Sequence, residues 1–218
     1  MEKLIIGSRG SKLATKYAEI AKKAFLKELD IEIEIKKITT GGDLILDRRT
    51  SEIGGKGEFI KNIEKELLRK NIDLAVHSLK DVPSVKTKGL RMDCFLKRND
   101  PQEVLINKEN LTLDKIKKNS VIGTSSLRRE FQLKHLRPDL DFKLIRGNIE
   151  TRIKKLDEDQ YDSIILAKAG LLSLSIENII SEVFECKKIV PPAVQGTIVI
   201  QSRDCLLYTS PSPRDSVV

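Results

Sequence analysis

The stretch Ile72-Asp73-Leu74-Ala75-Val76-His77-Ser78-Leu79-Lys80-Asp81-Val82-Pro83 indicates an α/β fold and places a ligand site within it. Its apolar first half predicts a buried strand, and polar side chains follow where that strand should end. Open α/β sheets bind ligands at the carboxyl ends of their strands. Because Pro83 has no backbone N–H and keeps the preceding residue extended, the polar segment should form a turn. Asp81 is therefore the first candidate for chemistry, the alternative being an ordinary turn with a solvated Lys–Asp pair.

The composition predicts a soluble protein with an anionic ligand. The chain has 218 residues, of which 39% are hydrophobic and 33% charged, enough for one large or two small cores. It has no apolar run of about 20 residues and no signal-peptide pattern, so we expect a cytoplasmic location and no membrane partner. The net charge of +8 favours an anion. Aromatic residues are only 4% and no base-reading motif occurs, which favours a small acidic molecule over nucleic acid.

The cysteines predict neither a disulfide framework nor a metal site. Cys94, Cys186 and Cys205 are an odd number and have no CxxC spacing. We expect Cys94 and Cys186 to be small apolar fillers of the core.

The N-terminal segment predicts an anion site. Lys3 to Gly7 should form a strand, and the glycine-containing turn 7–11 should open a helix from about Lys12 with one buried face. Free backbone N–H groups and the helix dipole point at such a turn. Arg9 and Ser11 lie in it, although Ser11 could be simply the helix cap and Arg9 a surface residue.

A long loop is predicted from 43 to 57, after a strand in which isoleucines alternate with charged residues at 31–36. Long loops in compact domains are usually lids or disordered. The loop contains Lys56 within Gly-Gly-Lys-Gly, which lacks the spacing of a phosphate-binding P-loop. A helix should follow it.

The strongest carboxylate-binding feature is predicted at 121–136. A strand ending at Thr124 leads through Ser125 and Ser126 into a helix that begins with Arg128 and Arg129. The helix N-terminus, the hydroxyls and the guanidinium groups should converge, and arginine pairs with carboxylates through two hydrogen bonds. The alternative is a capped helix with solvated arginines. The helix carries the apolar residues Phe131, Leu133 and Leu136. The same plan repeats at Arg146-Gly147-Asn148, which is followed by a helix bearing Arg152.

Several of these segments resemble the porphobilinogen deaminase (hydroxymethylbilane synthase) family. They include His-Ser-Leu-Lys-Asp-Val-Pro at 77–83, Ser-Arg-Gly-Ser-Lys-Leu-Ala at 8–14 and Leu-Ile-Arg-Gly-Asn at 144–148. The resemblance spans roughly 4–203. It implies an α/β fold similar to type 2 periplasmic binding proteins, in which two domains each have a mixed sheet flanked by helices. We expect domain 1 at 1–98 with a return strand at 195–203, and domain 2 at 99–194.

The resemblance also implies a function. A chain that resembles this family is expected to be a transferase. It would condense four porphobilinogen units head to tail, with release of ammonia, to hydroxymethylbilane in haem biosynthesis. The resemblance implies a monomer, a covalent dipyrromethane cofactor, and Asp81 as the catalytic residue. The substrate and cofactor would be bound by Arg9, Ser11, Lys56, Lys80, Thr124, Ser125, Ser126, Arg128, Arg129, Arg146, Gly147, Asn148, Arg152 and Gln195. The alternative is a small-anion solute-binding or ligand-sensing module of the same fold.

Two departures from the family pattern stand out. The family carries a glycine between the residues matching Val194 and Gln195, and this chain does not. Beyond Arg203 the family continues into a third, α+β domain with the cofactor cysteine, whereas we expect 204–218, rich in serine and proline, to be a non-native tail. Cys205 does not match the cofactor cysteine, and the activity of the chain is left open.

Overall fold

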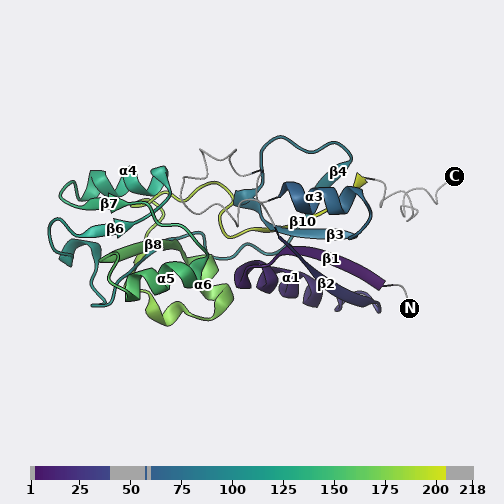
Figure 1. Cartoon of the computed structure of the whole chain (residues 1–218), viewed down its shortest axis with the longest axis horizontal. Coiled ribbons are helices and arrows are strands. Elements are labelled where there is room, and N and C mark those ends of the chain that lie inside the picture. Colours follow the sequence, from purple (N-terminus) through teal and green to yellow (C-terminus); the bar gives the residue numbers. More distant parts are fainter. Residues whose placement is uncertain (1–2, 40–56, 58–59, 205–218) are drawn as a thin grey trace.

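The computed structural model describes residues 3–39, 57 and 60–204 and consists of two five-stranded sheets (Figure 1). The first has the strand order β2-β1-β3-β10-β4. Its strands are β1 (Lys3–Arg9), β2 (Glu32–Ile38), β3 (Leu74–Ser78), β4 (Leu90–Phe95) and β10 (Ile198–Arg203). Strand β1 is parallel to β2 and β3, whereas β10 is antiparallel to β3 and β4.

The second sheet repeats this plan with the order β7-β6-β8-β5-β9. Its strands are β5 (Glu103–Ile106), β6 (Val121–Gly123), β7 (Asp141–Lys143), β8 (Ser163–Ala167) and β9 (Glu182–Phe184). The inner strand β6 is parallel to both neighbours, and β5 runs antiparallel to both of its own. Both sheets are therefore mixed, which confirms the predicted fold class.

Helices cover the faces of both sheets (Figure 1). They are α1 (Lys12–Phe25) and α3 (Lys61–Leu68) on the first, and α4 (Leu127–Leu136), α5 (Ile149–Asp157) and α6 (Lys168–Leu174) on the second. Short 3₁₀ helices are η3 (Leu79–Asp81), η4 (Leu113–Lys115) and η5 (Glu177–Ile179). Alternate residues of a strand face opposite sides, so Val76 packs on the α1 side and Ala75 on the α3 side.

The two halves are joined by two crossings that contact each other. The backbone N–H of Asn99 donates to the carbonyl of Gly196 at 2.9 Å. Gly196 has φ +87°, and a Cβ there would lie 2.3 Å from the Asn99 carbonyl oxygen, so only glycine fits. The predicted domain boundaries at 98/99 and 194/195 fall in these crossings, and the division there stays a prediction.

The expectation that the cysteines fill the core is wrong. Cys94 and Cys186 are exposed, because Cys94 lies near the end of the edge strand β4 and Cys186 in the turn after β9. On α4, Leu133 is the buried one of the apolar residues Phe131, Leu133 and Leu136, since Phe131 is 67% and Leu136 37% exposed. The inward face of α4 is instead shared by Leu133 and Arg129, one turn earlier. The predicted loop over 43–57, except Gly57, and the tail beyond Asp204 lie outside the described residues.

Candidate active site between the two sheets

A cleft of about 720 Å³ lies between the two sheets, where elements of both halves end. Its walls include the turn after β1, η3, and the N-terminal ends of α4, α5 and α6. The predicted residues that line it are Arg9, Ser11, Lys80, Asp81, Ser125, Ser126, Arg128, Arg129, Arg146, Gly147, Asn148, Arg152 and Gln195. Predicted separately along the chain, these side chains are brought together by the fold.

Of the predicted site residues that the structure describes, Thr124 does not line the cleft. Thr124 is 1% exposed, and its hydroxyl accepts a hydrogen bond from the backbone N–H of Ser126 at 3.1 Å. It shapes the turn that leads into α4 instead of facing the cleft. Lys56 lies outside the described residues.

The turn after β3 places Lys80 and Asp81 on the cleft wall. Leu79 donates its N–H to the carbonyl of Thr197 at 3.0 Å, so the residue directly before β10 holds the start of η3. Burial lowers the pKa of Lys80, an effect that the Asp81 carboxylate opposes. Lys80 therefore lies near Asp81, the acid of η3, and near the positive charges of Arg129 and Arg152.

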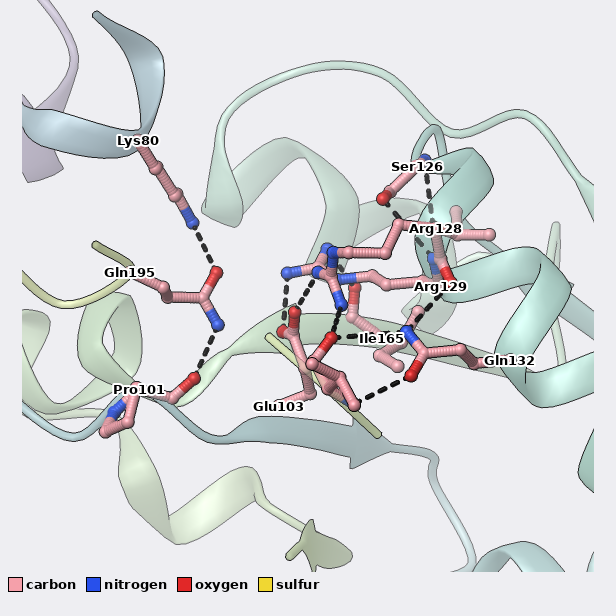
Figure 2. Close-up of polar contacts among 11 residues, drawn as sticks. Lys80, Pro101, Glu103, Ser126, Arg128, Arg129, Gln132, Ile165 and Gln195 are labelled. Carbon is pink, nitrogen blue, oxygen red and sulfur yellow. Dashed lines mark hydrogen bonds and ion pairs between the residues drawn. The ribbon is translucent and has the colours of Figure 1, made fainter. Parts of the chain in front are cut away.

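Gln195 connects this turn to both crossings (Figure 2). Its side-chain oxygen accepts from Lys80 Nζ at 3.1 Å, and its amide donates to the Pro101 carbonyl at 2.7 Å. The Gln195 carbonyl accepts from Arg98 Nε at 2.9 Å. Since Gln195 is only 1% exposed, these contacts fix the position of the Lys80 ammonium between the two halves.

The arginine pair of α4 is held by a buried acid that the sequence analysis missed (Figure 2). Glu103 on β5 is fully buried and forms ion pairs with Arg128 and, at 2.7 Å, with Arg129. Burial alone would raise the pKa of Glu103, but the two guanidinium groups hold it below its usual value. Arg129 also donates to the Ile165 carbonyl at 3.0 Å. An acid within the otherwise apolar run Glu-Val-Leu-Ile was the signal that could have revealed it.

Helix N-terminal caps orient the cleft-facing ends. Ser11 accepts from the Ala14 N–H at 3.3 Å, Ser126 from Arg129 at 3.4 Å and Asn148 from Thr151 at 2.8 Å. Ser11 is thus a helix cap as well as a cleft residue, which was one of the two interpretations left open for it.

The start of α5 contributes Arg146 and Arg152. Gly147 has φ +111°, and a Cβ there would lie 2.6 Å from Thr151 Cγ2, so this turn requires glycine. Arg152 donates to the Gly147 carbonyl at 2.9 Å. Burial, with repulsion from Arg129 and Arg146, lowers the pKa of Arg152 to about 10. A cation disfavoured in this way gains most from an incoming anion.

Comparison with known proteins agrees with this geometry. Residues 4–206 match the family model of porphobilinogen deaminase, dipyromethane cofactor binding domain. The porphobilinogen deaminase of Bacillus cereus (strain B4264) is 46% identical over 206 residues, and that of Oceanobacillus iheyensis 47% over 209. Each alignment covers 94% of this chain and 67% of the relative, so the chain spans about two thirds of their length.

Solved structures share the fold at low identity. A periplasmic substrate-binding protein of an ABC transporter from Coxiella burnetii matches with a TM-score of 0.56 and 11% identity, over 92% of this chain and 85% of its own. A putative methionine-binding lipoprotein from Bacillus subtilis matches with 0.52 and 13%, over 93% and 84%. At this identity the likeness concerns the fold alone.

Fold and site together define the class: a two-sheet α/β protein of the periplasmic-binding-protein type with a cationic cleft between its halves. Within that class, the chain belongs to the porphobilinogen deaminase family. Its function is the family's: hydroxymethylbilane synthesis from porphobilinogen in tetrapyrrole biosynthesis, with a dipyrromethane cofactor. The predicted family, enzyme class and cofactor are confirmed. Among the described residues, no helix is long and apolar enough to cross a membrane.

The residues present fit the cofactor. Dipyrromethane carries several carboxylates, and five arginines and a lysine line a cleft whose wall holds Asp81 as its acid. Within the described part of the chain, Nε of Arg129 is buried without a hydrogen-bond partner and provides a donor for a carboxylate.

Proposed function

We propose that Asp81 is the catalytic residue of this chain and that the cleft arginines hold the carboxylates of substrate and cofactor. The observation that supports this is the placement of Asp81 on the same cleft wall as Lys80, with Arg128, Arg129, Arg146 and Arg152 also lining the cleft. Every porphobilinogen unit carries an acetate and a propionate. Several guanidinium groups around one cleft suit such a ligand, because each can bind a carboxylate through two hydrogen bonds.

Asp81 would act where positive charge develops. When the C–N bond of the protonated aminomethyl group breaks, ammonia leaves with the electron pair and the substrate pyrrole becomes cationic, its charge shared with the ring N–H. A carboxylate within hydrogen-bond reach stabilises this cation more than the ground state, and so lowers the barrier. Asp81 can also move the proton to and from the amine.

The other groups would bind and orient. Arg128, Arg129 and Arg152 would hold the carboxylates of the incoming unit and of dipyrromethane, which supplies the pyrrole carbon to which new units are joined. Lys80, fixed by Gln195, would place a further positive charge on the cleft wall beside Asp81 and attract the carboxylates of the ligand.

The proposal includes finer features of the protein. We infer a cytoplasmic monomer without nucleic-acid or membrane partners, divided into domains at 98/99 and 194/195. The convergence of five arginines in one cleft, whose described lining has Tyr17 as its single aromatic residue, favours a small carboxylate ligand over nucleic acid. Size-exclusion chromatography with light scattering would test the monomer against the sequence mass of 24.6 kDa.

The experiment that tests the role of Asp81 is the Asp81→Asn variant. In an intact enzyme that carries the cofactor, the amide keeps the shape but lacks the charge, so turnover of porphobilinogen should fall by about 10²-fold or more. Asp141→Asn, on the exposed start of β7, is the matched control and should keep full turnover. Near-normal turnover in Asp81→Asn would remove Asp81 from the reaction.

A further inference from the structure

His77 is a buried, titratable side chain to which the proposed mechanism gives no role. It lies near the end of β3, is 5% exposed, and precedes Lys80 and Asp81 by a few residues. Its side chain is on the same side of the sheet as Ala75, which packs in the core beneath α3. The second histidine of the chain, His135, is exposed on α4 and provides an internal reference.

A chain of hydrogen bonds runs from His77 through two other elements. His77 Nε2 lies 3.0 Å from Gln201 Oε1 on β10, and Gln201 Nε2 donates to Glu64 Oε1 on α3 at 2.8 Å. The other Glu64 oxygen accepts from the Thr87 hydroxyl at 2.8 Å. The side-chain atoms His77 Nε2, both polar atoms of the Gln201 amide and both Glu64 oxygens thus have partners, which makes this chain a defined network.

The network fixes the position of the histidine proton. An ionised carboxylate can only accept hydrogen bonds, so the Gln201 amide nitrogen must face Glu64. Its oxygen then faces His77, and an oxygen acceptor requires a proton on Nε2. In the neutral ring, Nδ1 is consequently an acceptor.

The same network holds the catalytic turn from both ends. His77 precedes η3, and Thr87 lies in the segment that follows it, while Gln201 and Glu64 belong to elements that frame it. We propose that His77, with its proton on Nε2, is a positioning residue that holds η3 and thereby the Asp81 carboxylate in place. This inference rests on the proposed role of Asp81. A carboxylate displaced by about 1 Å can cost on the order of 10²-fold in rate.

The charges around His77 favour the neutral ring. Burial lowers its pKa, and Arg9 of β1 acts in the same direction. The Gln201 contact, Glu64 of α3 and Asp81 of η3 oppose this without reversing it. Over the pH range in which free histidine titrates, the ring should therefore keep one proton and one arrangement.

The first test is ¹⁵N NMR of the imidazoles. Protonated and bare ring nitrogens are readily distinguished, and the two histidines give two sets of signals. We expect His77 to show a protonated Nε2 and a bare Nδ1 throughout the range in which free histidine titrates, about pH 6 to 8. In Glu64→Gln the Gln201 amide is free to turn over, so the Nδ1–H tautomer should appear. A wild-type His77 with bare Nε2, or one whose ring gains a second proton between about pH 8 and 6, overturns the inference.

The second test compares His77→Leu with the conservative His77→Gln, whose amide can donate to Gln201. Turnover of the cofactor-loaded protein should fall about 10- to 100-fold in His77→Leu, with KM within about two-fold, and His77→Gln should recover most of it. Equal turnover in all three proteins overturns the inference. If His77→Leu does not fold, Glu64→Gln gives the same comparison. Failure of Asp81 as the catalytic residue would be recognised separately, by Asp81→Asn, and leaves the NMR result intact.

Discussion

Glu103 is fully buried and ion-paired with both arginines at the start of α4, so its charge decides the state of that pair. Glu103→Gln would keep the size of the side chain but leave two guanidinium groups without their anion. Breaking a buried ion pair on one side costs about 3 kcal/mol, and we expect the free energy of unfolding to drop by that amount in urea titrations. Glu109→Gln, whose side chain is 63% exposed, should change it by less than about 0.5 kcal/mol. Equal losses in the two variants would contradict this account.

The acid sensitivity of the protein should depend on the same residue. The guanidinium groups keep the pKa of Glu103 below its usual 4.5 in the folded state. Because a lowered carboxyl pKa adds stability above the unfolded value, this contribution is complete above about pH 4.5 and is lost as the pH falls through the folded value. Thermal unfolding between pH 3 and 6 should therefore show a shallower acid decline in Glu103→Gln than in the wild type. Parallel curves would indicate that Glu103 is not ionised in the folded protein.

At this scale the sequence predicted the cations and missed their partner. Arg128 and Arg129 were identified because they follow a hydroxyl-rich helix start, which is a local pattern. Glu103 lies some 25 residues away on another strand, and pairing over that distance leaves no periodic trace. The burial of Arg129 on α4 has the same origin, because its ion-pair partner Glu103 lies in the core.

At the scale of elements, the second crossing carries the effect of the missing glycine. Val194 adopts φ +60°, a left-handed conformation that is costly for a β-branched residue. It lies directly before Gln195, at the point where the family pattern has its additional glycine. Val194→Gly should relieve the strain and raise the free energy of unfolding by about 1 kcal/mol, less the entropy that glycine loses on folding. Chemical denaturation would measure this gain.

Val183→Gly is the control for that substitution. Val183 is 39% exposed, similar to Val194 at 40%, but lies within β9. Glycine there should lower stability by about 1 kcal/mol because strands disfavour it. Should both variants be destabilised alike, the strain at Val194 is not significant.

Helices and strands with a clear periodicity of apolar residues were predictable. Which of their side chains are buried was harder to predict. Alternating isoleucines predicted β2, and three- and four-residue steps predicted α1. The strain at Val194 was not predictable. The sequence shows that a glycine is missing there, but it does not show which residue adopts the left-handed conformation in its place.

At the scale of the whole molecule, two sheets of the same plan meet at a cleft that neither forms alone. Lys12 Nζ at the start of α1 lies 3.7 Å from Glu150 of α5, and a Cβ on Gly170 would lie 3.6 Å from Leu13. The halves therefore touch beside the cleft (Figure 1). Periodicity could predict two α/β runs, but the side chains that face each other across the cleft follow from topology. Only the family resemblance placed them together in advance.

Binding by this cleft can be tested without turnover. Porphobilinogen at 100 times its dissociation constant should stabilise the chain by about 2.7 kcal/mol, a melting-temperature rise of about 5–10 °C. Arg152→Leu removes a buried cation that gains from a carboxylate, and loss of a charged hydrogen bond worth about 1.5–3 kcal/mol should abolish most of the shift. Arg69→Leu, exposed at the end of α3, removes the same charge outside the cleft and should keep the full rise in melting temperature.

A duplex DNA of equal charge concentration should give no comparable rise in melting temperature at 0.15 M salt. If Arg152→Leu retains the full shift, or DNA matches it, the cations of the cleft are not the binding site and the net charge of +8 acts through the general surface instead.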